Sequence, residues 1–303
     1  MLSQKQMKEW IPEAVESFKA AMPSVEVPYP EIHIGSNATW LRIRDSVVSS
    51  LRSNQSRPDF TAALEVIRGK NGSAILIYQQ RLGNHVKTQA EFNHVLWHEL
   101  GHFFADTFED PTFCRFLDQK PHPDEIEAQR GYYFWTEFIA ETIACKVDPE
   151  PNIDWGNTYF YDTRNMLMEL LKNGIRLQQD EYIDWYDLAF YFAKSFSDKR
   201  VLSYLEAIDN GTLKYRRTYF DEPIPFRDSG IDPLCLDCVD KSYHTHLSEL
   251  SKILKNQLAE EQPCNVSLPT IILLGQTLRD IEFTSILSYN SDLFRQRILA
   301  AQR

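Results

Sequence analysis

The stretch "HVLWHELGHFFAD", residues 94–106, constrains this chain more than any other segment, because it places two histidines on one face of a predicted helix. His98 and His102 are four residues apart, so their imidazoles project from successive turns, about 6 Å apart along the axis. Both can reach one zinc ion. Glu99 is rotated by about 100° around the axis, where it can take a proton from a zinc-bound water. The segment therefore has the H-E-x-x-H pattern.

The residues around this pattern predict a capped amphipathic helix. Thr88 and Glu91 form an S/T-x-x-E capping box, so we expect the helix to begin near residue 89 and to end near 108. His94 lies on the same face as His102, but about 12 Å away along the axis, too far to share the ion. It is expected to line the cleft, to support a ligand, or to be buried and hydrogen-bonded. The opposite face carries an apolar stripe of Phe92, Leu96, Leu100 and Phe103.

Catalytic zinc usually takes three protein ligands, so a second element has to supply the third. The metzincin continuation is absent, because Ala105 and Phe108 stand where glycine and histidine would be needed. In "WTEFIAETIA", Glu137 and Glu141 are again four apart in an apolar helical segment. We expect Glu137 to bind zinc and Glu141 to accept the free ring N–H of a ligating histidine. The alternatives for the third ligand are Glu141, Asp106, His122 and Glu125.

Hydrophobic periodicity predicts an α+β fold for the first half of the chain and a mostly α-helical second half. The expected elements are an N-terminal helix, a strand at 31–35, a helix over 38–53, strands over 61–69 and 73–80, and helices over 89–108 and 132–147, with residues 109–130 mainly loop. The two later strands should form a hairpin with a type I′ turn at Asn71-Gly72. We expect the segment "AILIYQQ", residues 74–80, to be an edge strand beside the cleft that holds an extended peptide.

A segment rich in Pro, Asp and Asn, residues 148–157, is the expected domain boundary. It divides the chain into a catalytic domain over residues 1–147 and an accessory region of unknown role over residues 148–303. The helices expected in the accessory region cover residues 159–175, 180–208, 241–260 and 268–281, with a loop-rich insert over 210–240.

H-E-L-G-H at 98–102, followed by E-F-I-A-E at 137–141, resembles the gluzincin metallopeptidases, most closely the compact ImmA/IrrE-like type. The resemblance covers about residues 31–147 and implies a zincin-like domain, a small sheet with a hairpin plus the two helices. It implies that His98, His102 and Glu137 are the zinc ligands. Glu99 matches the general base and Glu141 the acid that supports a ligand.

These residues predict a zinc-dependent peptidase that hydrolyses peptide bonds of a protein or peptide substrate, with Glu99 as general base. Tyr132, Tyr133 and His122 are candidate donors to the oxyanion. A rival hypothesis is a catalytically silent zinc-containing sensor or partner-binding module. A third is a helical scaffold with an accidental motif.

Composition limits the partners and the compartment. A formal net charge of -11 argues against binding to nucleic acid or to anionic membranes, which both need a positive field. No apolar run approaches the ~18 residues of a membrane span, and the N-terminus lacks the apolar core of a signal peptide. Five scattered cysteines do not form a disulfide framework, so we expect a reducing cytoplasm.

One further group of residues offers nitrogen and sulfur ligands in "CLDCVDKSYHTH". C-x2-C followed so closely by H-x-H is not a familiar zinc-finger spacing, and we expect reduced thiols in a loop there. The expectation is therefore one zinc ion per chain and no structural zinc at this group, which comprises Cys235, Cys238, His244 and His246.

Overall fold

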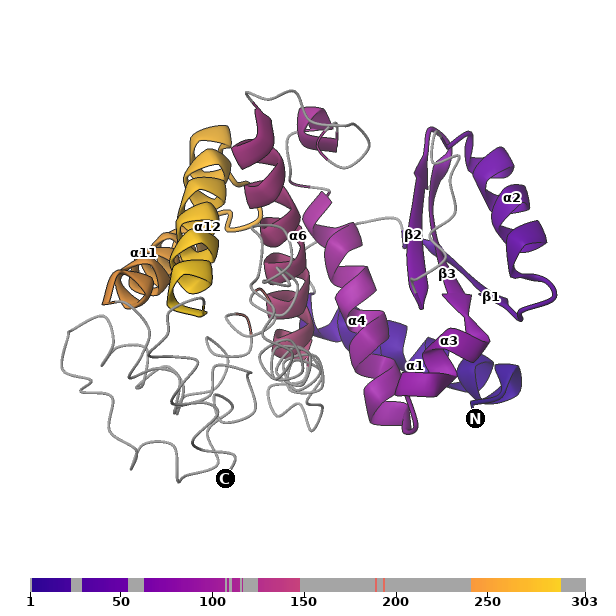
Figure 1. The fold of residues 1–303 in the computed structure, drawn as a ribbon. Coiled ribbons are helices and arrows are strands. Elements are labelled where there is room, and N and C mark those ends of the chain that lie inside the picture. Colours follow the sequence, from indigo (N-terminus) through magenta and orange to yellow (C-terminus); the bar gives the residue numbers. More distant parts are fainter. Residues whose placement is uncertain are drawn as a thin grey trace, which may run out of the picture. The chain divides into compact units, whose positions relative to one another are not determined.

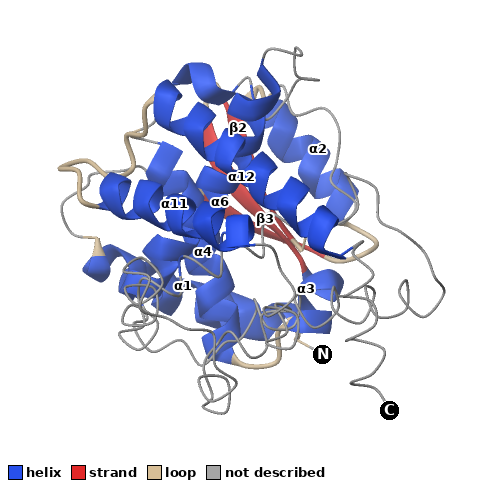
Figure 2. Ribbon diagram, turned by 60° about the vertical axis from the view of Figure 1, so that its left-hand side comes forward, coloured by secondary structure: helices blue, strands red, loops and turns tan. Residues whose placement is uncertain are grey.

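The structure of this protein is a computed structural model that describes residues 2–22, 29–53, 63–106, 108, 111–114, 116, 125–147, 189, 193 and 241–289. Helices make up most of this part of the chain, together with a three-stranded sheet, and the predicted α+β class is confirmed (Figures 1 and 2). The chain divides into two compact units. The first comprises Met1–Glu109 with Ile139–Ile153, and the second Asp110–Phe138 with Asp154–Arg303.

The sheet of the first unit contains β1 (Glu31–Gly35), β2 (Leu64–Gly69) and β3 (Gly72–Tyr78) in the order β1-β3-β2. Strand β3 is central, because it pairs in parallel with β1 and antiparallel with β2. The prediction that this segment is an edge strand is therefore wrong. Its continuous apolar run fits a strand buried on both faces, and residues 74–78 are at most 2% exposed. The edges are β1 and β2.

The predicted hairpin joins β2 to β3, but its turn differs from the expected type I′. Gly69 pairs with Gly72, so the two central residues are Lys70 and Asn71, and neither has a positive φ. Gly72, which follows the turn, has φ 129°. Glycine is also needed at position 69, because a Cβ there would lie 2.1 Å from the Leu51 carbonyl oxygen.

Helix α2 (Trp40–Leu51) covers one face of the sheet, and the core beneath it includes Trp40 and Tyr78, whose rings meet edge to face. Beneath this helix the Arg44 guanidinium, only 1% exposed, binds Glu65 of β2 with an N–O distance of 2.8 Å. Tyr78 donates its hydroxyl proton to the same carboxylate. A short helix, α3 (Gln79–His85), follows β3 directly where strand had been expected for Gln79 and Gln80.

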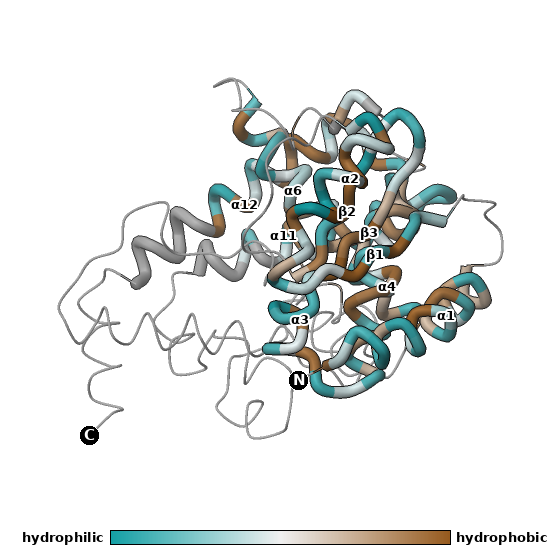
Figure 3. Tube along the Cα trace, turned by 90° about the vertical axis from the view of Figure 1, so that its right-hand side faces the viewer, coloured by the Kyte–Doolittle hydropathy of each residue, from teal (hydrophilic) through white to brown (hydrophobic). Residues whose placement is uncertain are grey.

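Helices α1 (Gln4–Ala21) and α4 (Gln89–Asp106) pack together in the first unit. The predicted capping box of α4 is present, since the Thr88 hydroxyl accepts the Glu91 N–H and Glu91 accepts the Thr88 N–H. The Trp97 indole N–H donates to the buried Ala14 carbonyl at 2.8 Å. Hydrophobic and hydrophilic residues alternate along α1 (Figure 3). The buried residues of this helix, which packs against α4, are Met7, Ala14 and Phe18. This packing fixes the helix that carries the H-E-x-x-H pattern.

In the second unit, α6 (Ile126–Val147) contributes its first part, and α11 (Lys241–Leu258) and α12 (Leu268–Tyr289) pack against each other. A Cβ on Gly131 of α6 would lie 1.9 Å from the Ile271 carbonyl oxygen, and one on Gly275 of α12 would lie 1.8 Å from that of Glu127. Both glycines therefore permit a close helix crossing. Arg279 closes the same contact with an ion pair to Glu127 at 2.7 Å.

The start of α6 and the end of α12 differ from expectation, since α12 ends at Tyr289 and not at residue 281. Helix α6 begins at Ile126 and not at residue 132, and Gly131 lies inside it, where it permits the close crossing with α12. Within the predicted loop, Pro111–Cys114 forms a 3-10 turn. The expected boundary at 148–157 and the expected elements over 159–175, 180–208 and 210–240 lie outside the described residues, apart from residues 189 and 193. In the described ranges no helix has the length and apolarity to cross a membrane.

Candidate metal centre

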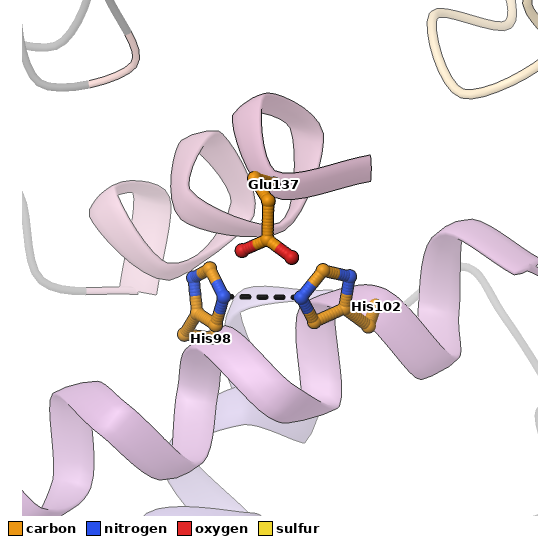
Figure 4. A group of neighbouring side chains, drawn as sticks. All are labelled: His98, His102 and Glu137. Atoms are coloured by element: carbon orange, nitrogen blue, oxygen red, sulfur yellow. Dashed lines mark hydrogen bonds between the residues drawn. The ribbon is translucent and has the colours of Figure 1, made fainter. Parts of the chain in front are cut away.

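Helix α4 presents His98 and His102 side by side on consecutive turns, as the spacing predicted. Their Nε2 atoms are 3.1 Å apart, and the ring planes are nearly perpendicular, at 89° (Figure 4). His98 is 8% exposed and His102 is half-buried. The two nitrogens that can bind a metal therefore face one another at a partly open position.

Glu137 of α6 joins the two histidines. One ligand atom from each of His98, His102 and Glu137 lies within 4.8 Å of the others. The carboxylate points toward both rings (Figure 4). The structure thus brings together the three residues that were predicted as ligands.

The donor set and its spacing fit a zinc ion. Two imidazoles and one carboxylate form a common ligand set of catalytic zinc, which leaves a further position open. With zinc–nitrogen distances near 2.05 Å and tetrahedral angles, two bound nitrogens lie about 3.3 Å apart. The observed Nε2–Nε2 distance of 3.1 Å is close to that value.

Glu141 lies one turn after Glu137 and accepts hydrogen bonds from two histidines of α4. Its Oε1 is 2.8 Å from His94 Nε2 and its Oε2 is 3.0 Å from His98 Nδ1. The carboxyl group is 3% exposed. Burial by itself raises the pKa of Glu141, but the charges and hydrogen bonds of His94 and His98 outweigh it and hold that pKa well below 4.5. Glu141 is therefore an ionised carboxylate that accepts one hydrogen bond from each of the two histidines.

This contact fixes the tautomer of His98. Because Nδ1–H donates to Glu141, the neutral ring keeps its lone pair on Nε2, the atom that faces His102. Glu141 was predicted to accept the ring N–H of a ligating histidine; it accepts that of His98, whose role as a ligand stays a prediction. His94, left open between lining the cleft, supporting a ligand and being buried, is 2% exposed and bonded to Glu141.

The close approach of α4 and α6 depends on Gly101. A Cβ at this position would lie 2.6 Å from the Ala140 carbonyl oxygen and 3.0 Å from its Cα. The glycine inside H-E-L-G-H thus lets α6 lie against α4 with its two glutamates beside the histidines. This role of Gly101 was not predicted, although a glycine within a helical pattern is a recognisable signal of close packing.

Glu99, the predicted general base, is partly exposed. In the part of the chain that the structure describes, no hydrogen bond or ion pair engages its carboxylate. An unengaged carboxylate next to a ligand in the sequence is available to accept a proton.

The other candidate residues do not join this group. Asp106 forms an ion pair with Arg68 of β2. Glu125 immediately precedes α6, three turns before Glu137. Tyr132 is 1% exposed and packs against Phe113 and Phe116, while Tyr133 is half-buried.

Other candidate residues lie outside the described part of the chain, namely His122, Cys235, Cys238 and the side chain of His244. His246 contacts Glu249 on α11 at 3.2 Å.

No protein family, curated protein or solved structure matches this chain.

Proposed function

We propose that this protein is a zinc-dependent metallopeptidase of the gluzincin type, most like the compact ImmA/IrrE-like group. The observation that carries the proposal is the convergence of His98 and His102 with Glu137 within 4.8 Å. The three side chains would hold zinc, and Glu141 keeps His98 in the tautomer that zinc requires. Zinc bound by such ligands polarises a carbonyl group and acidifies water.

Glu99 supplies the proton transfers. Its carboxylate accepts a proton from the attacking water and passes that proton to the nitrogen of the leaving amine. This role requires a carboxylate that no other group occupies, and Glu99 satisfies this condition among the described residues. Tyr133, which is half-buried one turn before Glu137, remains a candidate donor to the oxyanion, whereas Tyr132 is enclosed by aromatic rings.

Both β1 and β2 are edge strands, and β2 is the one that contacts α4, so we propose β2 as the strand that pairs with an extended substrate. Arg68 of β2 forms an ion pair with Asp106, so this strand lies beside the end of α4. Its outer edge has no partner strand in the described sheet. An extended peptide pairing there would run past α4, which supports a protein or peptide substrate. The charge of -11 argues against nucleic acid and anionic membranes as partners, and we propose a cytoplasmic location on the cysteine usage.

The decisive experiment combines metal analysis with Glu99→Gln. The purified protein should contain one zinc ion per chain and cleave members of a proteome-derived peptide library, with cleavage read by mass spectrometry. Glu99→Gln should keep the zinc, because this residue is not a ligand, and should lose about 10² to 10⁴-fold in turnover. His33→Ala, a histidine on β1 outside the metal group, is the control and should retain both properties.

The rival sensor hypothesis makes a different prediction for the same variant. A catalytically silent zinc protein would cleave no peptide, and Glu99→Gln would leave its partner binding unchanged. A parent protein that binds no zinc would refute both hypotheses. Equal turnover by the parent and by zinc-loaded Glu99→Gln would refute the peptidase mechanism.

A further inference from the structure

Burial of the His94 side chain carries a cost in folding free energy. It is 2% exposed, and its Nδ1 is buried without a hydrogen-bond partner. A buried polar atom left unsatisfied costs about 1–3 kcal/mol, a cost that an apolar side chain would avoid. The ring's hydrogen bond from Nε2 to Glu141 Oε1, at 2.8 Å, is therefore the interaction that can explain a histidine at this position.

That bond engages one oxygen of the Glu141 carboxylate, and the other oxygen accepts a hydrogen bond from His98, a proposed metal ligand. Oε2 of Glu141 accepts from His98, and Oε1 accepts from His94. The remaining neighbour of Oε1 is the Cys145 thiol, at 3.9 Å, which is a weak donor. Without His94, the buried Oε1 would keep only this weak donor, and the plane of the carboxylate would be free to turn away from His98.

His94 itself is not placed to bind the metal. It is absent from the group formed by His98, His102 and Glu137, and its Nε2 is already committed to Glu141. A proton on Nε2 leaves Nδ1 with only a lone pair, in agreement with the lack of an acceptor beside it. The ring therefore acts as a fixed donor to Glu141.

We propose that His94 is a positioning residue: by holding Oε1 of Glu141, it orients Oε2 toward His98 Nδ1 and so aims the Nε2 lone pair of His98 at the metal. The chain His94–Glu141–His98 extends the support of the ligand one residue further into the core. This inference rests on the proposed zinc site for its effect on metal affinity. Its effect on the His98 tautomer requires no metal.

The test compares three variants of the full chain. His94→Phe keeps a ring but removes the donor, whereas His94→Gln keeps an N–H at a similar reach. Asn93→Leu is the matched control, because Asn93 is the adjacent buried residue of α4 and its Oδ1 also has no partner. Zinc affinity is measured by competition with a chromogenic chelator, and the visible spectrum of the Co²⁺-loaded protein reports ligand geometry.

Removal of a residue that supports a metal ligand typically weakens metal binding roughly 10 to 100-fold. We expect that loss in His94→Phe, together with an altered Co²⁺ spectrum, recovery to within about threefold of the parent in His94→Gln, and no change in Asn93→Leu. If His94→Phe does not fold, His94→Asn replaces it, since its amide is too short to reach Glu141. Parent-like affinity in the variant that lacks the donor, or a loss in His94→Gln as large as in that variant, would overturn the proposal.

A measurement on the metal-free protein separates this proposal from the proposed function. Nitrogen-15 NMR of the His98 ring should show Nδ1 protonated in the parent and in His94→Gln, and a mixture of tautomers in His94→Phe. If the parent binds no zinc, the proposed function fails, and the tautomer of His98 alone decides the role of His94. An unchanged tautomer in His94→Phe would overturn that role.

Discussion

Helices α4 and α6 meet at two histidine–glutamate pairs that are chemically alike and differ in burial. The inner pair, His94 with Glu141, is 2% and 3% exposed and forms a hydrogen bond of 2.8 Å. The outer pair, His102 with Glu137, is half-buried, and both residues belong to the potential metal group. His98 contacts both pairs. The same two residue types therefore form a buried hydrogen bond at one end of the site and belong to the potential metal group at the other.

The difference follows from the position of each pair along the two helices. Residues late in α4 lie near those earlier in α6, so the helices run in opposite directions along the site. At the inner pair, the surrounding helices exclude water, and an unpaired carboxylate would be costly, so Glu141 is paired on both oxygens. At the outer pair, partial exposure leaves solvent access to the residues that could hold a metal ion.

The largest expected effect comes from breaking the outer pair. Glu137→Ala leaves two protein ligands, a poor zinc site, so the zinc content should fall from one per chain to nearly none. Mass-spectrometric metal analysis after dialysis against zinc-free buffer measures this change. Glu125→Ala, just before α6, is the matched control and should keep its zinc. Full occupancy in Glu137→Ala, or loss in the control, would show that the third ligand was wrongly assigned.

The crossing of α4 and α6 positions both histidine–glutamate pairs. A glycine substitution at this crossing, compared with one at another helix crossing, tests its role. Alanine at Gly101 would meet the Ala140 backbone at 2.6 Å, and the backbones have to separate. Overpacking of this kind costs about 1–3 kcal/mol of unfolding free energy, more than the helix propensity gained over glycine. We expect lower stability in urea for metal-free Gly101→Ala and weaker zinc binding, because the separation moves both glutamates away from α4.

Gly275→Ala is the comparison for that result. It is overpacked against the Glu127 carbonyl oxygen on a different pair of helices, α12 and α6. It should lower stability by a similar amount without a comparable loss of zinc affinity in the folded protein. If both variants weakened zinc binding equally, the α4–α6 crossing would have no special role in setting the site.

Much of the site was predictable because it depends on local geometry. A spacing of four residues on a helix places side chains on one face, and this rule sufficed for His98 with His102 and for Glu137 with Glu141. The capping box at Thr88 and Glu91 likewise gave the start of α4, because capping is a short-range interaction.

The missed features depend on which elements meet. The central position of β3 follows from long-range pairing with β1 and β2, which the pattern within "AILIYQQ" does not reveal. The loop predicted up to residue 130 missed the first part of α6, whose partner across Gly131, α12, is distant in the sequence. The partner of His94 was open for the same reason, since it required knowing which face of α6 lies against α4.

The inner pair should also make stability depend on pH, with a smaller effect than the glycine substitutions. The pKa of Glu141 is lower in the folded than in the unfolded state. Ionised Glu141 therefore stabilises the metal-free protein at pH values above its unfolded-state pKa, near 4.5. This stabilisation is lost as the pH falls toward the pKa of the folded state. Glu141→Gln should therefore lower the urea midpoint more at pH 5.5 than at pH 3.0. A destabilisation by Glu141→Gln that grew toward pH 3.0 would have the wrong sign for a carboxyl group whose pKa is lowered in the folded protein.

The smallest expected effect concerns Asp106, which is an alternative third ligand at the end of α4. Its ion pair with Arg68 is partly exposed, with side chains 24% and 30% accessible, and such pairs contribute at most about 1 kcal/mol. Asp106→Asn keeps the size and a hydrogen-bonding oxygen, so unfolding in urea should shift by less than that amount. Zinc content should stay at one per chain, because Asp106 is engaged by Arg68 and lies outside the metal group. Loss of zinc in a folded Asp106→Asn protein, with zinc retained in Glu137→Ala, would transfer the third ligand to α4 and end the distinction between the inner and outer pairs.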